Sequence, residues 1–450
     1  MSSKRGVLDY IISIMVSMST IHNAITDLQK NLKASVSPFH TVLYAQKYLE
    51  ERGFEKLELG ESWKNRVRAG GSYFVPVFES TLAAFTVGIE IGRAPALRLE
   101  AAHTDWPCLK VKPSPEVTMG KYAKLNVEVY GGPLLQTWLD RPLSLAGRVC
   151  VAGKDAFHPR TQFVDFKRPL LTIPNLAIHM NRDANNGVAL NAQVDMLPLA
   201  TNVGMFLDKD QFFMNLLAGE IGVAAEDILD FEFCVYNMDE GVLCGFSEDF
   251  LSAPRLDNIT SVEACLYGLT KGCNTTGINA ITLYDNEEIG SMTKQGAQSP
   301  VMEHILEKLY MALGYDREDF LNGLLNGFLL SMDVAHAIHP NHPEKCDIKN
   351  QIFLNDGVAI KQSSSQSYAT DACADSIIEG LCRANEIPYK KFSNRSDVKG
   401  GGTLGKISSC LMTMRAADVG VPMLAMHSSR EVMGMADQCA LNELARVFFS

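Results

Sequence analysis

Residues 278–288 read Ile-Asn-Ala-Ile-Thr-Leu-Tyr-Asp-Asn-Glu-Glu, a largely apolar run that stops abruptly at acidic side chains. A short apolar run bounded by polar residues predicts a buried strand from Ile278 to Tyr284. Three further segments have the same form: Ala96 to Ala102 before His103, Phe328 to Met332 before Asp333, and Met423 to Met426 before His427. In open α/β sheets, ligands gather outside the carboxyl ends of the strands. We therefore expect these polar side chains to converge.

Helical segments lie between the predicted strands. One runs from Val301 to Leu313. The C-terminal segment has apolar residues at helical spacing on one face, namely Val432, Ala436, Ala440, Leu444 and Phe448. Strands that alternate with helices predict the α/β class.

The stretch from Leu109 to Gly245 has a different texture. Its alternating segments, Lys124 to Tyr130 and Leu145 to Val151, are separated by Gly131-Gly132-Pro133. Alternation broken by glycine and proline is typical of β-structure. We therefore predict a β-rich domain at 109–245, inserted into a catalytic domain made of 1–108 and 246–450, with 1–35 as an N-terminal extension or helix.

Composition excludes several classes of protein. The net charge is -11 and the basic residues are dispersed, which argues against nucleic-acid binding. The apolar run from Ile11 to Met18 is too short to span a membrane. The eleven cysteines are scattered and never form a Cys-x-x-Cys pair, so we expect neither a disulfide framework nor a thiolate zinc site, and we place the protein in the reducing cytoplasm.

The residues at and near the strand ends suit a dinuclear metal site. Hydrolysis at neutral pH needs an activated water, a Lewis acid and a base, and two metal ions supply the first two. The donors are imidazoles and carboxylates without thiolate, a set that favours catalytic zinc and admits manganese or cobalt. They are His103, Asp257, Glu288, Asp333 and His427.

Each of these residues also has a plainer interpretation. A single aspartate at a strand end is more often a helix N-cap, and a single histidine is more often a core residue. The adjacent pair Glu287 and Glu288 is harder to explain in this way, because neighbouring buried carboxylates repel each other. We expect one of them to bind a cation and the other to stay free as a base. Asp105 lies two residues from His103 and is expected to orient it.

Several sequence blocks, in order along the chain, resemble the aspartyl aminopeptidase and vacuolar aminopeptidase I family of dizinc peptidases. The resemblance runs from Ser-Pro-Phe-His at 37–40 almost to the C-terminus, and residues 394–405 look more like the bacterial members. The blocks include Ala-His-Thr-Asp-Trp-Pro-Cys at 102–108, Pro-Arg-Leu-Asp-Asn at 254–258, Asp-Asn-Glu-Glu-Ile-Gly-Ser at 285–291, Asp-Val-Ala-His-Ala at 333–337 and Ala-Met-His-Ser-Ser-Arg-Glu at 425–431.

The resemblance implies a three-layer α/β/α catalytic domain with an inserted dimerisation domain. It implies one zinc ion on His103, Asp257 and Asp333, with Asp257 bridging to a second zinc ion on Glu288 and His427. Glu287 would be the general base. Positions that contact substrate in the family are matched by His336, Lys361 and Tyr368, and His179 matches a histidine lent to a neighbouring subunit. Family members form dimers that assemble into a tetrahedral dodecamer, which admits short peptides.

The sequence leaves substrate specificity open. Trp106 stands where many relatives have serine, and Asn237 falls where the acid-specific members have aspartate. Lys361 can pair with a substrate carboxylate and so favours N-terminal Asp or Glu, whereas other branches of the family prefer neutral or hydrophobic residues. Two alternatives to an aminopeptidase also stay open at this point. They are a related dinuclear hydrolase, such as a carboxypeptidase or deacylase, and a non-catalytic peptidase-like scaffold.

Overall fold

The strand predicted from its apolar run, β13, lies inside a nine-stranded sheet. The computed structural model describes residues 19–92, 95–203, 211–398 and 400–450. The order of this sheet is β1-β2-β3-β13-β4-β14-β18-β16-β17. Its strands are β1 (Glu55–Lys56), β2 (Ser72–Val77), β3 (Thr81–Val87), β4 (Leu97–His103), β13 (Ile278–Tyr284), β14 (Phe328–Met332), β16 (Val358–Lys361), β17 (Tyr389–Phe392) and β18 (Arg415–Gly420).

The central strands of this sheet are parallel. β13 pairs with β4 so that Tyr284 lies opposite His103, and β14 pairs with β4 so that Ser331 lies opposite Ala101. The carboxyl ends of these three strands therefore share one edge of the sheet. The predicted α/β class and the predicted convergence of these strand ends are confirmed.

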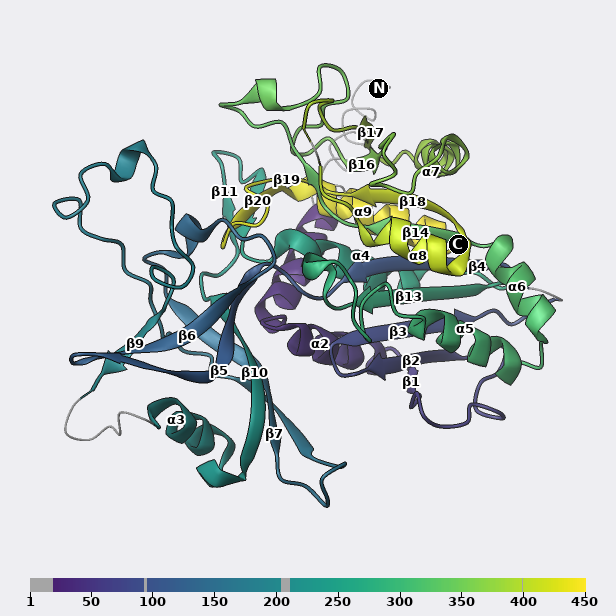
Figure 1. The fold of residues 1–450 in the computed structure, drawn as a ribbon. Helices are drawn as coiled ribbons and strands as arrows, with labels where there is room; N and C mark the ends of the chain where they lie inside the picture. The colour runs from purple at the N-terminus through teal and green to yellow at the C-terminus, as the bar shows by residue number, and fades with distance from the viewer. Residues whose placement is uncertain (1–18, 93–94, 204–210, 399) are drawn as a thin grey trace, which may run out of the picture.

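Helices cover both faces of the nine-stranded sheet (Figure 1). Successive residues of β3 point to opposite sides, with Leu82 in one buried cluster and Ala83 in another. The first cluster includes residues of α2 (Pro38–Glu50), α4 (Leu256–Lys271), α7 (Ala372–Ala384) and α9 (Met435–Phe448). The second includes residues of α5 (Val301–Ala312), α6 (Arg317–Leu325) and α8 (Leu404–Met412). The result is a three-layer α/β/α arrangement.

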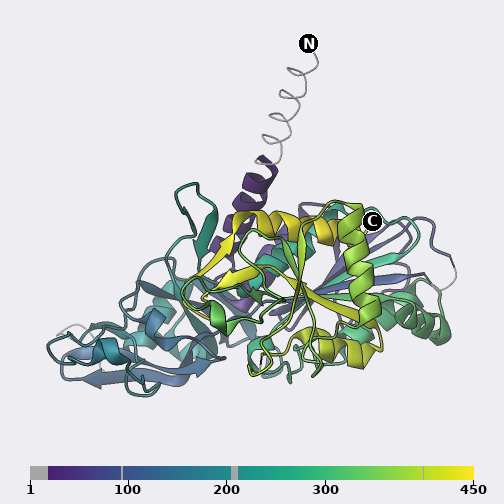
Figure 2. The same cartoon turned by 90° about the horizontal axis from the view of Figure 1, so that it is seen from above.

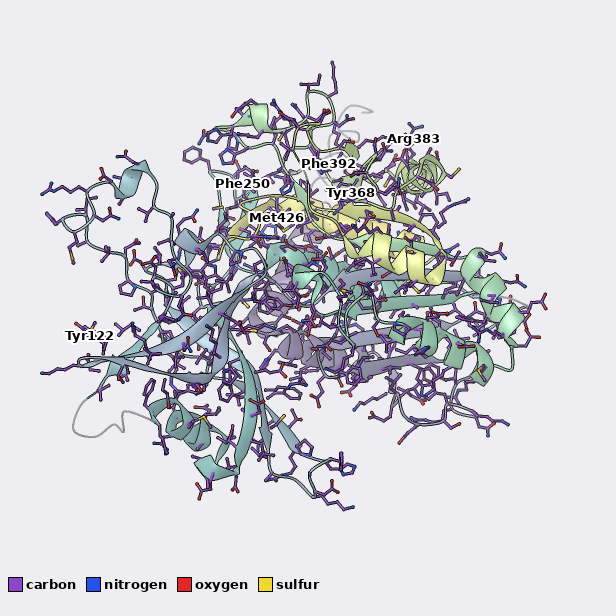
Figure 3. All side chains as sticks on the ribbon, in the orientation of Figure 1. Tyr122, Phe250, Tyr368, Arg383, Phe392 and Met426 are labelled. Carbon is purple, nitrogen blue, oxygen red and sulfur yellow. The ribbon has the colours of Figure 1, made fainter. Side chains whose placement is uncertain are left out.

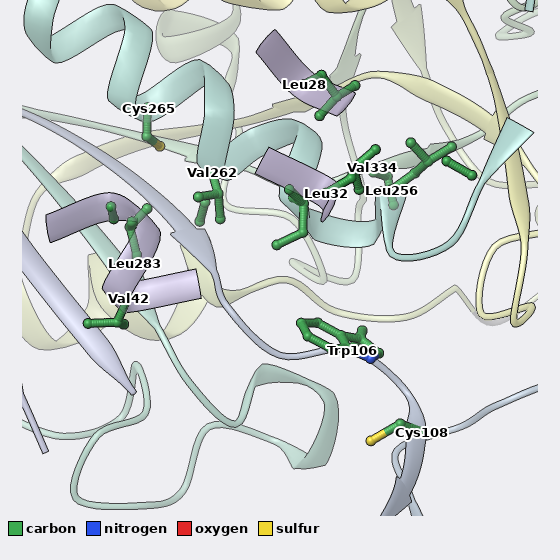
Figure 4. Close-up of a cluster of buried hydrophobic side chains, with 14 of the residues drawn as sticks. Leu28, Leu32, Val42, Trp106, Cys108, Leu256, Val262, Cys265, Leu283 and Val334 are labelled. Atoms are coloured by element: carbon green, nitrogen blue, oxygen red, sulfur yellow. The ribbon is translucent and has the colours of Figure 1, made fainter. Parts of the chain in front are cut away.

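The N-terminal helix packs against the first buried cluster. Residues 19–34 are helical, and their Leu28 and Leu32 lie near Val262 of α4 and Val42 of α2 (Figure 4). The predicted N-terminal extension is thus a packed helix over this range. Its first part, with the apolar run from Ile11, lies outside the described residues.

A six-stranded antiparallel sheet projects to one side of the layers (Figures 1 and 2). The helix α3 (Phe212–Ile221) contributes Phe213 and Leu217 to the same buried cluster as this sheet. Tyr122 lies at its outer end, far from Tyr368 of the three-layer part (Figure 3). The strands, in sheet order, are β8 (Arg160–Asp165), β7 (Leu143–Val151), β10 (Ile228–Asn237), β5 (Cys108–Met119), β6 (Tyr122–Tyr130) and β9 (Leu199–Asn202).

The third sheet corrects two predictions. The segment predicted as a strand from Met423 to Met426 is the shorter β19, and it belongs to this sheet rather than to the nine-stranded one. Val432, predicted on the C-terminal helix, lies in β20, because its backbone pairs with Ser252 of β12. The strands, in sheet order, are β11 (Val242–Cys244), β12 (Phe250–Ala253), β20 (Glu431–Gly434), β19 (Pro422–Leu424) and β15 (Ala335–His336).

All eleven cysteines lie in the described part of the chain and are free thiols. Across the residues that the structure describes, we find no helix with the length and apolarity that crossing a membrane requires.

Candidate metal centre

His103 is the last residue of β4 and begins the first group of metal donors. Its Nε2 atom lies 3.5 Å from Oδ1 of Asp257 and 3.7 Å from Oδ1 of Asp333. Asp333 follows β14, the strand beside β4, and Asp257 lies in the non-helical start of α4. The sheet and the start of α4 therefore bring together three side chains that are far apart in the sequence.

His427 lies in the turn between β19 and β20 and belongs to a second group of metal donors. Its Nε2 atom lies 3.5 Å from Oδ2 of Asp257 and 3.5 Å from Oε2 of Glu288. Glu288 lies in the 3-10 turn η4 (Glu287–Ile289), which follows β13. Asp257 thus presents one carboxylate oxygen to each histidine, and it belongs to both groups of donors.

The spacing of these donors fits zinc. The separations of 3.5 to 3.7 Å exceed the length of an N–H···O hydrogen bond. Two ligands bonded to one tetrahedral zinc at about 2.0–2.1 Å would lie about 3.3 Å apart. In addition, Oδ1 of Asp257 is buried and has no hydrogen-bond partner among the described residues. An ion between the donors would satisfy that oxygen.

Main-chain carbonyl groups orient both histidine rings. Nδ1 of His103 donates to the carbonyl oxygen of Asp105 at 3.0 Å, and Nδ1 of His427 donates to that of Gly132 at 3.1 Å. Nε2 of each ring is therefore free to bind a metal ion. The turn that supplies Gly132 includes Gly131, whose φ of 72° lies in the left-handed region.

The Asp105 carboxylate holds the η4 turn. It accepts hydrogen bonds of 3.1 Å from the backbone amides of Glu287 and Glu288 and one of 2.6 Å from the hydroxyl of Tyr130. The sequence predicted Asp105 as the group that orients His103. In the structure the main-chain carbonyl of Asp105 accepts the hydrogen bond from Nδ1 of His103, and Oδ1 of its carboxylate lies 3.4 Å from the same nitrogen. The carboxylate also positions the two glutamates.

The buried charges shift several pKa values. Burial, with repulsion from Asp333, Asp105 and Asp257, raises the pKa of Glu287 to about 8, although His103 opposes the rise. Burial lowers the pKa of His427, but the nearby carboxylates outweigh it and raise that pKa to about 10. Crowded carboxylates in a buried site are typical of a place that binds cations.

Lys361 and Tyr368 lie beside the Asp333 end of the centre. Nζ of Lys361 donates to the carbonyl oxygen of Val334 at 3.0 Å, and it lies 3.8 Å from Oδ2 of Asp333 and 5.0 Å from the centre of the Tyr368 ring. The Lys361 side chain is buried. The Lys361 ammonium group therefore lies next to Asp333, which is one of the metal donors. His336 lies on β15 nearby in the fold and is exposed.

The structure places His179 elsewhere. It lies in the segment between β8 and β9 and is exposed, and its side chain has no hydrogen-bond or ion-pair partner among the described residues. Trp106 and Asn237, the two positions at which the sequence departs from many relatives, are buried near the second group of donors. Trp106 lies 5.5 Å from the Arg255 guanidinium, and Nδ2 of Asn237 donates to the carbonyl oxygen of Ser429 at 3.1 Å.

The α/β/α layers and the two sets of histidine and carboxylate donors define a zinc-dependent hydrolase, and comparison with known proteins identifies the family. The model of the aminopeptidase I zinc metalloprotease family (M18) matches residues 31–449. A probable M18 family aminopeptidase 2 of Clostridium acetobutylicum is 43% identical over 417 residues, 92% of this chain and 96% of the relative. A protein of the same name from Stutzerimonas stutzeri is 39% identical over 93% of this chain and 96% of its own length.

Solved structures agree with this result. Ape4, in its cryo-EM complex with Nbr1, has a TM-score of 0.92 and 32% identity, and the match covers 96% of this chain and 86% of that one. The yeast aminopeptidase 1 (Ape1) crystal structure has a TM-score of 0.82 and 25% identity over 96% of this chain and 97% of that one. The chain belongs to the M18 family and is a metallo-aminopeptidase. Membership of this family favours aminopeptidase activity over the carboxypeptidase, deacylase and scaffold alternatives.

Sequence reasoning assigned no role to two residues that hold the centre. Tyr130 ends β6 and reaches Asp105 from the six-stranded sheet. Glu431 lies within the recognised block at 425–431 and accepts hydrogen bonds from the backbone amides of His427 in the same block and of the distant Asp257. A glutamate next to an apolar strand segment was the only sign in the sequence that Glu431 is buried. No rule of residue spacing predicts which backbone amides it binds.

Proposed function

We propose that this aminopeptidase removes the N-terminal residue of short peptides with two zinc ions. His103, Asp257 and Asp333 would hold one ion, and Asp257, Glu288 and His427 the other, with manganese or cobalt as possible substitutes. The observation that carries the proposal is Asp257, whose two oxygens lie 3.5 Å from two different histidines. When bound, the two ions would polarise the scissile carbonyl and lower the pKa of water.

In this proposal Glu287 transfers the proton and Asp105 holds Glu287 in place. Glu287 takes a proton from the attacking water and later passes it to the leaving amine. Its backbone amide is held by the Asp105 carboxylate at 3.1 Å, which keeps the side chain beside Glu288 and His103. Asp105 acts as a positioning residue.

The test is the substitution Glu287→Gln. It should abolish turnover on a free dipeptide while leaving the zinc content at about two equivalents per chain, because a general base typically contributes a hundredfold or more. N-blocked versions of the same peptides should not be cleaved by the unmodified enzyme. Activity of Glu287→Gln within tenfold of the unmodified enzyme would remove Glu287 from this role.

Specificity depends on Lys361. Among the described residues Nζ of Lys361 has one hydrogen bond, to Val334, so donors remain for a substrate carboxylate, which supports a preference for N-terminal Asp or Glu. The distance of 3.8 Å to Asp333 supports the other candidate, in which the lysine charge is taken up by the metal centre and neutral or hydrophobic residues are preferred. A panel of fluorogenic N-terminal residues, with zinc, manganese and cobalt, separates the two candidates.

The assembly is part of the same proposal. The S. cerevisiae mApe1 dodecamer has a TM-score of 0.82 and 25% identity to this chain, which supports a homo-oligomer. We propose that segment 109–245 is an inserted dimerisation domain, that His179 and the exposed loop around it serve a neighbouring subunit, and that dimers assemble to a dodecamer in the cytoplasm. Light scattering of the purified protein tests the subunit number.

A further inference from the structure

One buried carboxylate joins the backbones of two metal donors. Oε1 of Glu431 accepts a hydrogen bond of 2.8 Å from the backbone amide of His427, and Oε2 accepts one of 3.0 Å from the backbone amide of Asp257. The Glu431 side chain is 2% exposed. Both of its oxygens are therefore used within the protein, and each binds one donor residue.

The fold explains why a single glutamate reaches both amides. Glu431 is the first residue of β20, which pairs with β12 so that Glu431 lies opposite Ala253. Asp257 follows β12 by four residues, and His427 precedes β20 in the adjoining turn. The glutamate side chain thus reaches from the start of β20 to the segment that follows β12 and to the turn that precedes β20.

The same device occurs on the other side of the centre. Asp105 binds the amides of Glu287 and Glu288 with its two carboxylate oxygens. An ionised carboxylate accepts hydrogen bonds at both oxygens, whereas an amide side chain offers one acceptor oxygen and an NH₂ group that would face a second N–H donor. A side chain that accepts a hydrogen bond from two backbone amides, one at each terminal atom, must therefore be a carboxylate.

We propose that Glu431 is a positioning residue for the metal position formed by Asp257, Glu288 and His427. The inference rests on the proposed two-metal function and deepens it. Glu431 sets the separation between the Asp257 carboxylate and the His427 ring, whose atoms Oδ2 and Nε2 lie 3.5 Å apart. The position formed with His103 and Asp333 depends on it less, because these two residues are held by the paired strands β4 and β14.

Zinc binding by the full-length protein tests the inference. Glu431→Gln should retain one tight zinc equivalent and bind the second about ten- to a hundredfold more weakly, which is the usual loss when a partner of a ligand is removed. The matched control is Glu263→Gln. Glu263 is 1% exposed, lies in α4 and accepts a hydrogen bond from Asn31 at 2.8 Å, and it is not one of the metal donors. The control should bind both equivalents as the unmodified chain does.

Thermal unfolding with and without zinc separates positioning from simple structural support. A ligand that binds only the folded state raises Tm, and at a fixed ligand concentration the rise is larger when Kd is lower. Glu431→Gln should therefore show a smaller zinc-induced rise in Tm, whereas Glu263→Gln should change the zinc-free Tm but not the rise. Glu431→Asp keeps both oxygens on a shorter side chain and should bind the second zinc with intermediate affinity, which provides a second measurement if Glu431→Gln does not fold.

Three results would overturn the inference. They are unchanged affinity for the second zinc in Glu431→Gln and Glu431→Asp, an unchanged zinc-induced rise in Tm despite a lower zinc-free Tm, or equal losses in the Glu263→Gln control. An unmodified chain that binds fewer than two zinc ions would instead refute the two-metal proposal itself. That result is visible before any variant is compared.

Discussion

The hydroxyl of Tyr130 donates a hydrogen bond of 2.6 Å to Oδ2 of Asp105. Tyr130 is the last residue of β6, so a residue of the six-stranded sheet contacts the carboxylate that positions the metal-centre turn. The same hydroxyl accepts a hydrogen bond of 2.9 Å from Nδ2 of Asn286. The projecting sheet is therefore connected to the centre of the catalytic layers through a side chain.

Removal of this hydroxyl should weaken catalysis. In Tyr130→Phe, Asp105 loses one of its three donors and holds the amides of Glu287 and Glu288 less firmly. We expect kcat/KM to fall about tenfold or more, as for other partners of metal-site residues. Steady-state kinetics beside Tyr122→Phe, a change at the exposed outer end of the same strand, check this. Equal activities of the two variants would contradict the role of Tyr130.

Removal of metal should cost both activity and stability. A chelator should abolish turnover and lower Tm, since loss of ions present at a hundred times their Kd removes about 2.7 kcal/mol per site. Zinc should restore both properties. His427→Ala should retain one zinc equivalent, because its Nε2 faces only the Glu288 and Asp257 side of the centre. Two tight equivalents in His427→Ala, measured by metal analysis, would argue against the assignment.

Stability should depend on pH through Glu263, which lies six residues after Asp257 in α4 and is hydrogen-bonded to Asn31 rather than to a metal donor. Burial raises its pKa to about 7 in the folded protein, above the ordinary value of 4.5. The folded state therefore binds a proton that the unfolded state releases, and this stabilisation is complete below about pH 4.5 and is lost as pH rises through about 7. At pH 8 the buried carboxylate should cost up to about 3 kcal/mol, since one pKa unit is about 1.4 kcal/mol.

Glu263→Gln removes this titration and keeps an oxygen that Asn31 can reach. The Tm of the variant relative to the unmodified protein should therefore increase between pH 5 and pH 8. Thermal unfolding across this range measures the difference. A difference in Tm that stays constant with pH would show that Glu263 does not titrate as described.

The role proposed for His179 predicts complementation between inactive chains. If His179 serves a neighbouring site, a mixed dimer of His179→Ala and Glu287→Gln chains contains one complete site. Random pairing in a two-fold dimer should then restore about a quarter of the unmodified activity. Co-expressed and singly expressed variants can be compared for peptidase activity. No gain in the mixture would place His179 outside the neighbouring site.

Local sequence determined the central strands and much of the donor set. The buried parallel strands β13 and β14 are nearly continuous apolar runs, a pattern that burial on both faces requires, so their limits could be predicted from residues 278–284 and 328–332. Because such a strand must end where polar side chains begin, Glu287, Glu288 and Asp333 could be identified as residues at its carboxyl end.

Tertiary structure alone decided how these residues meet. The apolar segment at 422–424 pairs with β15 and β20 rather than joining the nine-stranded sheet, and nothing in its own residues specifies that choice. The same holds for Glu431, whose oxygens bind amides four and 174 residues away. Hydrophobic periodicity reports the burial of a residue within its own element, whereas a hydrogen bond between distant elements depends on how those elements pack, and that becomes defined only when the chain has folded.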